Sequence, residues 1–217
     1  RVLSIAGTDP TGGAGIQADL KSISAAGGYG MSIVTALVAQ NTQGVRNVHV
    51  PPVDFLQEQL DSVIDDVEID AVKIGMLADA AITAKVAAFL RRLPADVPVV
   101  LDPVMVATSG DRLLEEEAEQ AVRDLCSQVD LITPNLKELA VLTHTNEASD
   151  LEEAIATAKE WAKAANTAVV VKGGHLDGDI ADNAVVNADG SVHRVAASRV
   201  DTKNTHGTGC SLSSALA

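Results

Sequence analysis

The segment VLSIAGTDPTGGAGIQADLKSISAA at residues 2–26 joins a short apolar run, a glycine-rich turn and a helical pattern. The run from Val2 to Ala6 predicts a buried strand, and the residues from Ala14 to Ala26 predict a helix. A strand that leads through a turn into a helix is the repeating unit of parallel sheets. If this unit recurs along the chain, the sequence predicts an α/β fold.

The unit does recur, because further apolar runs are followed by helical patterns. Pro51 and Pro52 mark the start of one such helix, and Asp150 is a suitable N-cap for another. The predicted strands are Ser32 to Ala39, Ala71 to Ile74, Val99 to Asp102, Leu131 to Thr133 and Ala168 to Lys172. The predicted helices are Val53 to Val67, Ala80 to Leu93, Glu115 to Ser127, Leu136 to Leu142 and Leu151 to Ala165.

The pattern changes near residue 180, where two short runs flank a turn at Asp189-Gly190 and predict a β-hairpin over Ala184 to Val195. A last helix is expected to begin at about Thr208, and the chain stops within it at Ala217. We therefore expect one domain over residues 1–217. It should be a three-layer αβα fold with a mostly parallel central sheet, helices on both faces and a truncated C-terminal part.

Composition narrows the functional classes. The 217 residues are 47% hydrophobic, which fits a globular domain, and no apolar run approaches the roughly 18 residues of a membrane span. A formal net charge of -14 argues against nucleic acid as a partner, since phosphate binding needs clustered Lys and Arg. The two cysteines cannot build a disulfide framework, and Cys126 falls on an apolar helical stripe. A soluble, cytoplasmic protein without a secretory leader is expected.

The sequence NTHGTGC at residues 204–210 is the strongest chemical signal. A glycine-rich turn that opens onto a helix directs free backbone N–H groups and the positive end of the helix dipole at one point, which favours an anion. Cys210 would lie in the first turn, where the dipole lowers the thiol pKa. A proton acceptor beside a cradle for negative charge suits phosphoryl transfer to an alcohol. The alternative is a tight loop followed by a buried, inert cysteine.

The first glycine loop, Gly7 to Asp19, lacks the Lys-Ser/Thr pair of a P-loop. Its GAGIQA stretch at residues 13–18 loosely matches a dinucleotide-binding turn. The second strand, however, ends in Ala39-Gln40-Asn41 and lacks the acidic residue that would bind a ribose, so a nicotinamide site is disfavoured.

Other strand ends carry polar side chains as well. Asp102 could reach a metal ion or a phosphate-bound Mg²⁺, and Lys172 precedes two glycines that would let a phosphate approach. Asn135 and Glu138 lie three apart at a helix start, a spacing that by itself favours a capping box. Gln40-Asn41 and Gly75-Met76-Leu77 are each typical of simple turns. Ligands of open parallel sheets bind at the carboxyl ends of the strands, so all of these sets point to one face.

Taken together, these motifs resemble the ribokinase-like superfamily and, within it, the hydroxymethylpyrimidine/phosphomethylpyrimidine kinases of thiamin biosynthesis. The resemblance runs along the whole chain. It is carried by residues 6–10, 12–19, 39–42, 73–77, 102–106, 133–135, 171–175 and 204–210.

The resemblance implies a ribokinase-like kinase that uses ATP and Mg²⁺ to phosphorylate 4-amino-5-hydroxymethyl-2-methylpyrimidine and then its monophosphate. Asp19 and Gln40 would hydrogen-bond the pyrimidine, and Cys210 would take the place of the superfamily's aspartate base. Gly7, Met76 and Val104 would complete the pyrimidine site. Gly207, Gly209 and Lys172 would act on the phosphoryl group; Asn135, Lys172 and Thr208 would bind the nucleotide; and Asp102 and Glu138 would hold Mg²⁺.

Two alternatives stay open at this point. A pyridoxal or pyridoxine kinase would also take a hydroxymethyl group on a nitrogen heterocycle, and a domain that binds a vitamin precursor without turnover would share the pocket. The family resemblance also implies a homodimer. The expected partners are otherwise a small pyrimidine and ATP, with no nucleic acid and no membrane.

Overall fold

A computed structural model describes residues 1–105, 116–175, 181–202 and 204–217. Within these residues, nine strands form one sheet in the order β3-β2-β1-β4-β5-β6-β7-β8-β9. The strands are β1 Val2–Gly7, β2 Gly30–Asn41, β3 Gly44–His49, β4 Ala71–Ile74, β5 Val99–Leu101, β6 Leu131–Ile132, β7 Ala168–Lys172, β8 Asn183–Val186 and β9 Val192–Val195.

In the middle of the sheet the strands pair in parallel, in the order β2-β1-β4-β5-β6-β7. Antiparallel pairing is confined to β3 at one edge and to β8 and β9 at the other. The predicted mostly parallel sheet is therefore confirmed. The expected hairpin is β8 and β9, with a turn in which the Asp189 carboxylate accepts the N–H of Ser191. The edge strand β3, which forms a hairpin with β2, was not predicted.

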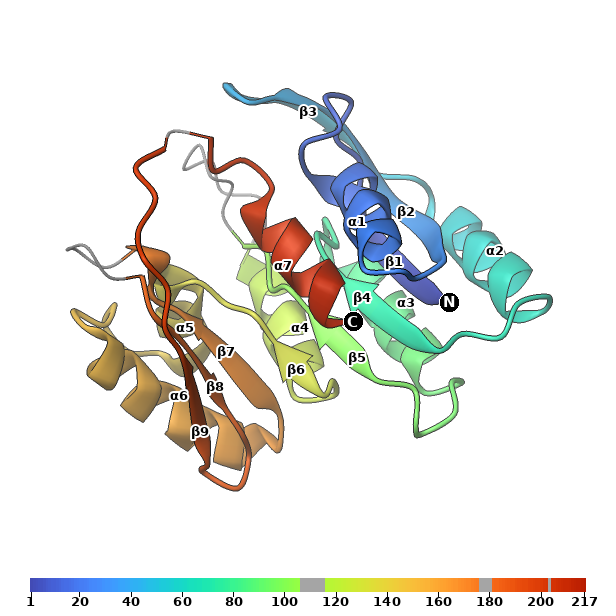
Figure 1. Cartoon of the computed structure of the whole chain (residues 1–217). Helices are drawn as coiled ribbons and strands as arrows, with labels where there is room; N and C mark the ends of the chain where they lie inside the picture. The colour runs from blue at the N-terminus through green and yellow to red at the C-terminus, as the bar shows by residue number, and fades with distance from the viewer. Residues whose placement is uncertain (106–115, 176–180, 203) are drawn as a thin grey trace.

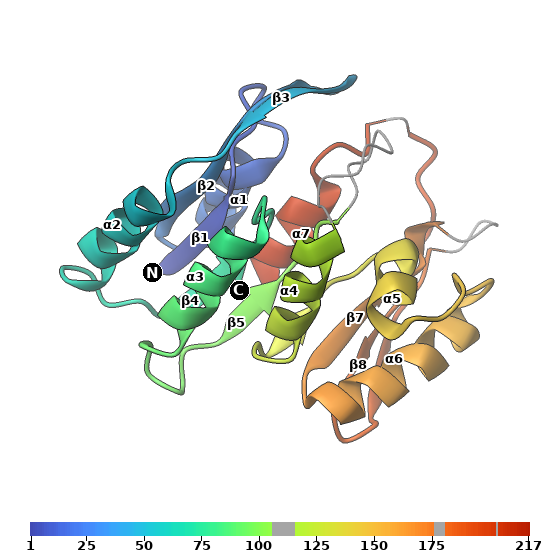
Figure 2. The same ribbon diagram turned by 180° about the vertical axis from the view of Figure 1, so that it is seen from behind.

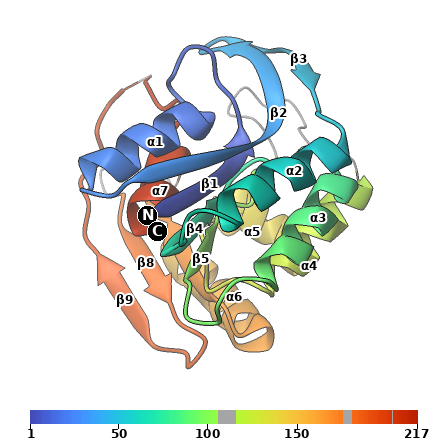
Figure 3. The ribbon, with the colours of Figure 1, turned by 90° about the vertical axis from the view of Figure 1, so that its right-hand side faces the viewer.

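Helices cover both faces of the sheet (Figure 3). Helices α1 and α7 lie side by side on the face toward the viewer in Figure 1, and α2 to α6 lie on the face seen in Figure 2. Their bounds are α1 Gly15–Ala25, α2 Val53–Ile64, α3 Ala80–Leu90, α4 Glu116–Cys126, α5 Leu136–Thr143, α6 Leu151–Ala165 and α7 Thr208–Leu216, with a short 3-10 helix η1 at Gly173–His175.

The predicted helices agree with these bounds to within a few residues, although residue 115 of one prediction lies outside the described parts. Asp150 caps α6 by accepting the N–H of Glu153, as predicted. Helix α2 follows Pro52 directly. In the described parts of the chain, no helix is long and apolar enough to cross a membrane.

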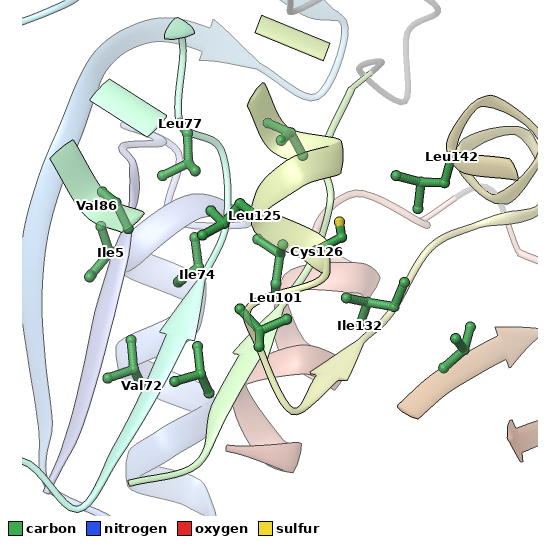
Figure 4. Close-up of a cluster of buried hydrophobic side chains, with 14 of the residues drawn as sticks. Ile5, Val72, Ile74, Leu77, Val86, Leu101, Leu125, Cys126, Ile132 and Leu142 are labelled. Atoms are coloured by element: carbon green, nitrogen blue, oxygen red, sulfur yellow. The ribbon is translucent and has the colours of Figure 1, made fainter. Parts of the chain in front are cut away.

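The main core fills the space between the sheet and the helices of Figure 2. Aliphatic side chains of β4 to β6, among them Ile74, Leu101 and Ile132, face Leu125 and Cys126 of α4 in Figure 4. Cys126 is fully buried, which confirms its predicted place in the core. Burial raises the pKa of its thiol far above the ordinary value, so this cysteine is chemically silent.

Strand order defines where a ligand is expected. The chain leaves β1 for β2 on one side and later returns to β4 on the other side of β1. Such a reversal opens a crevice at the carboxyl ends of the neighbouring strands. The strand order therefore places the expected crevice at the carboxyl ends of β1, β2 and β4.

Candidate active site

The loop after β1 is organised by Asp9, whose side chain is fully buried. Its carboxylate accepts the backbone N–H groups of Thr11 at 2.9 Å and Ala14 at 2.8 Å. It also lies 2.7 Å from Nε2 of His206, which is 197 residues further along the chain. Burial raises the pKa of Asp9, but the hydrogen bonds from His206 and Thr11 outweigh it and hold the pKa below its usual value. This pair ties the glycine loop to the C-terminal turn.

The two glycine turns touch through their backbones. Gly207 has φ +77°, a left-handed conformation, and a Cβ there would collide with the carbonyl oxygen of Gly13. A Cβ at Gly15, where φ is +56°, would collide with the carbonyl oxygen of Gly7. Both positions therefore require glycine, for conformation and for space.

Helix α7 begins at Thr208, and no side chain caps its N-terminus. The exposed Thr208 donates its hydroxyl to the carbonyl oxygen of Thr205 at 3.0 Å. The N–H of Thr208 donates to the Thr205 carbonyl oxygen at 3.3 Å, and the N–H groups that follow it at the start of the helix are in the position to donate to an anion.

Gly209 brings the start of α7 against two charged residues. A Cβ at Gly209 would lie 3.2 Å from Oδ2 of Asp102 and 3.8 Å from Nζ of Lys172. The Lys172 ammonium is 3.6 Å from Oδ1 of Asp102, and that oxygen also accepts the Thr133 hydroxyl at 2.8 Å. Gly209, Asp102 and Lys172, which come from three separate sequence motifs, thus form one cluster. It combines a cation, a carboxylate and the backbone at the start of a helix.

Glu138 lies at the start of α5, close enough to this cluster to sense its charge. It forms a complete capping box with Asn135, in which the two residues exchange hydrogen bonds of 2.8 and 2.9 Å, so the prediction from spacing is confirmed. Burial, and then the charge of Asp102, raise the pKa of Glu138 to about 7. The carboxyl groups of Glu138 and Asp102 therefore repel each other beside the start of α7.

A second group of predicted residues surrounds the end of β1. The sulfur of Met76 would lie 3.4 Å from a Cβ at Gly7, and the carbonyl oxygen of Met76 accepts the hydroxyl of Thr35 at 2.6 Å. Nε2 of Gln40 donates to the carbonyl oxygen of Thr8 at 3.2 Å. Gln40 and Met76 are both partly exposed, so they can contact a ligand.

Val104 is also partly exposed and follows Asp102, whose carbonyl oxygen accepts its N–H at 2.8 Å. It lies in the loop after β5, beside the charged cluster. Val106, the last residue of the same motif, lies outside the described residues.

Two sequence predictions are corrected here. Asp19 was expected to hydrogen-bond the substrate, but its side chain is fully buried and both of its oxygens are occupied by Ser4, Lys73 and Ser214. The thiol of Cys210 was expected to have a lowered pKa. Burial instead raises it, although the charge of Lys73 acts in the opposite direction.

The chain is similar to known kinases. Residues 9–217 match the family described as phosphomethylpyrimidine kinase. The chain is also 51% identical over 216 residues to the hydroxymethylpyrimidine/phosphomethylpyrimidine kinase of Escherichia coli, with 99% of this chain and 80% of that protein covered. The chain belongs to the phosphomethylpyrimidine kinase family.

Other members and neighbours of this family extend the comparison. The thiamine biosynthesis multifunctional protein ThiED of Corynebacterium efficiens is 63% identical over the whole chain, which spans only 29% of that protein. Among solved structures, phosphomethylpyrimidine kinase from Clostridium difficile has a TM-score of 0.84 at 35% identity, covering 99% of this chain and 87% of that one. An ADP complex of Bacillus subtilis pyridoxal kinase has a TM-score of 0.87 at 33% identity, covering 99% and 81%.

Proposed function

We propose that this chain transfers the γ-phosphoryl group of ATP to the hydroxymethyl group of 4-amino-5-hydroxymethyl-2-methylpyrimidine, and then to the phosphate of the monophosphate formed. The observation that carries the proposal is the meeting of Gly209 with Asp102 and Lys172 at the uncapped start of α7. That cluster is suited to a phosphoryl group, and the ends of β1, β2 and β4 beside it are where the strand order places a ligand. The names of the relatives support the same substrate pair.

The pyrimidine would lie at the ends of β1, β2 and β4. Met76 and Val104 offer apolar contact to a flat ring, and the side-chain amide of Gln40 can hydrogen-bond a ring nitrogen or the exocyclic amine. A side chain at Gly7 would fill the space next to the Met76 sulfur. Glycine would therefore leave room there for the ring. This arrangement would direct the hydroxymethyl group toward α7.

The phosphoryl donor would occupy the other half of the crevice. Lys172 would bind the phosphates of ATP, Asn135 and Thr208 would contact the nucleotide, and the N–H groups around Gly207 and Gly209 would hold the group in transfer. In the reaction, a bond forms between the alcohol oxygen and the γ-phosphorus while the bond from that phosphorus to the ADP oxygen breaks. ADP leaves with the electron pair, and the alcohol proton passes to the thiolate of Cys210.

The acidic residues beside this cradle fit Mg²⁺. Burial, and after it the charge of Asp102, raise the pKa of Glu138, and a divalent cation between the two carboxyl groups would offset both effects. In the described residues no group of three or more His, Cys, Asp or Glu could hold a metal, so the phosphates and water would supply the remaining ligands, as is usual for Mg²⁺. When bound by Asp102 and Glu138, Mg²⁺ would neutralise phosphate charge.

A direct test offers the purified chain ATP and Mg²⁺ with either the pyrimidine alcohol or pyridoxal, and identifies the products by phosphorus NMR. We expect the pyrimidine monophosphate and then the diphosphate, with pyridoxal a poor substrate. Phosphorylation of pyridoxal in preference would favour the pyridoxal kinase alternative. Binding of the pyrimidine, seen as a thermal shift, without any phosphorylated product would favour the non-catalytic alternative.

A further inference from the structure

Lys73 of β4 is a charged residue that the proposed reaction does not yet use. Its side chain is fully buried, and its ammonium lies 2.8 Å from both oxygens of Asp19 on α1. Ser4 of β1 and Ser214 of α7 donate their hydroxyls to the same carboxylate at 2.6 and 2.8 Å. A buried ion pair is costly to form and frequently adds no net stability. Its presence beside a candidate site therefore calls for a functional explanation.

Two helices connect this cluster to Cys210. Ser214 is four residues after Cys210 on α7, so the two side chains lie on one face of that helix. Asp19 is four residues after Gly15 on α1, and the backbone N–H of Gly15 donates to the Cys210 sulfur. Each helix thus places one residue at the sulfur and another, one turn later, at the ion pair. Cys210 and Lys73 are therefore close enough for each to act on the charge of the other.

Glycine at the end of β4 leaves room for the ammonium of Lys73. A Cβ at Gly75, between β4 and Met76, would lie 2.9 Å from Nζ of Lys73. A side chain at this position would therefore crowd the cation. The charged groups that face Cys210 are Lys73 from β4, Asp19 from α1 and Asp102 from the end of β5. Only Lys73 among these three favours a negative sulfur.

We propose that Lys73 is a positioning residue whose buried positive charge, fixed by Asp19 and Ser214, stabilises the thiolate of Cys210. This inference rests on the proposed function of Cys210 as proton acceptor. Burial works against the thiolate, and the fixed cation offsets part of that cost without moving during the reaction. Asp19 thereby has a part in catalysis without contact to the substrate, which explains its place in the first glycine motif.

The test measures how the alkylation rate of Cys210 by iodoacetamide depends on pH, in the absence of substrate. The obvious variant, Lys73→Met, leaves Asp19 as an unpaired buried charge and can fail to fold for that reason. The double variant Lys73→Met with Asp19→Asn removes both charges and keeps the packing. Ser4→Ala is the matched control, because it removes one hydrogen bond from the same cluster without altering its charge. Peptide mass spectrometry separates Cys210 from the buried Cys126.

We expect the midpoint of alkylation to rise by about one pH unit in the double variant, and to stay at the wild-type value in Ser4→Ala. A double variant that folds and titrates within about 0.3 units of wild type would overturn the role of Lys73. The pH profile of kcat then tests the proposed function separately. If the alkylation midpoint shifts while the kcat profile does not, Lys73 supports the thiolate but Cys210 is not the base.

Discussion

Gln40 is the residue from which substrate recognition can be tested most cleanly. Its amide nitrogen already donates to the Thr8 carbonyl oxygen, which fixes the side chain at the mouth of the crevice and leaves its oxygen available to a ligand. Gln40→Leu should weaken binding of the pyrimidine by about 1–3 kcal/mol, because a polar edge of the ligand loses its partner. Isothermal titration calorimetry with the pyrimidine and with ATP measures both effects.

The matched control is Gln43→Leu, at an exposed position in the turn between β2 and β3. It should leave both affinities unchanged, and Gln40→Leu should leave ATP binding nearly unchanged. Equal losses for the two ligands in Gln40→Leu would mean that the pyrimidine site is assigned to the wrong residues.

At the residue scale, the sequence predicted which side chains stand at the ends of the strands, and the structure brings two of them, Asp102 and Lys172, to within 3.6 Å. Gln40, Met76, Asp102 and Lys172 all follow apolar runs, and parallel strands bring such ends to one edge. Sequence reasoning missed Lys73, because a lysine inside a strand is expected to be solvated and its partner Asp19 lies 54 residues away. The family resemblance also implied contact of Asp19 with the substrate, because a motif match does not distinguish a buried carboxylate from an accessible one.

The contact between the two glycine turns is a property of whole elements, since it sets where α7 starts relative to α1. Gly207→Ala should destabilise the fold by more than the conformational penalty alone, because the new methyl group meets the carbonyl oxygen of Gly13. It should also lower kcat, because it would displace the backbone N–H groups around Gly207 and Gly209 that are proposed to hold the phosphoryl group. Urea unfolding and initial-rate measurements on the same preparation test both effects.

Gly190→Ala supplies the matched control. Gly190 has φ +85° in the turn between β8 and β9, and nothing lies within 4 Å of its missing Cβ. This variant should cost only the left-handed penalty of about 1–2 kcal/mol and leave kcat intact. If the two variants lost the same stability, the contact between the turns would contribute nothing.

At the element scale, the hairpin of β8 and β9 was predictable because Asp189-Gly190 is a strong turn signal. The edge strand β3 was not. Its residues at Gly44–His49 alternate only weakly, and most of them are half-buried or exposed, so no apolar run marks the strand. The pairing of His206 with Asp9 also escaped prediction, because only the folded sheet brings these elements together.

The ionisation of Glu138 should make the free energy of unfolding of the whole molecule depend on pH. Its pKa of about 7 in the folded state exceeds the value near 4.5 of an unperturbed glutamate. The folded chain therefore holds this proton more tightly than the unfolded chain. The stabilisation is complete below the unfolded pKa and is lost as pH rises to the folded pKa, a change of about 3 kcal/mol. In Mg²⁺-free buffer, the free energy of unfolding of Glu138→Gln relative to wild type should rise by that amount between about pH 4 and pH 8.

Glu153→Gln is the matched control for this measurement. Glu153 accepts the N–H of Ser149 at the start of α6, but it is exposed and its pKa is lowered by that bond and by the Ser149 hydroxyl. Its contribution is present at neutral pH and is lost on acidification, which is the opposite sign. Urea unfolding of both variants across the pH range distinguishes them, and parallel slopes would contradict the burial of Glu138 beside Asp102.

The whole chain carries a formal charge of -14, yet its proposed donor is a polyanion. Binding must therefore depend on local positive groups, namely Lys172 and the start of α7. Cys210 lies in the first turn of that helix.

The most direct test of this account is the steady-state phosphorylation rate of Cys210→Ala at saturating substrates, with the pyrimidine affinity measured separately by calorimetry. Positioned proton removal is worth about 100-fold to 10,000-fold, so kcat should fall by that factor while the pyrimidine Kd stays within a few-fold. Cys210→Asp should recover part of the rate, because a carboxylate can also accept the proton. A Cys210→Ala variant with kcat within about threefold of wild type would contradict the account and leave Cys210 with a packing role only.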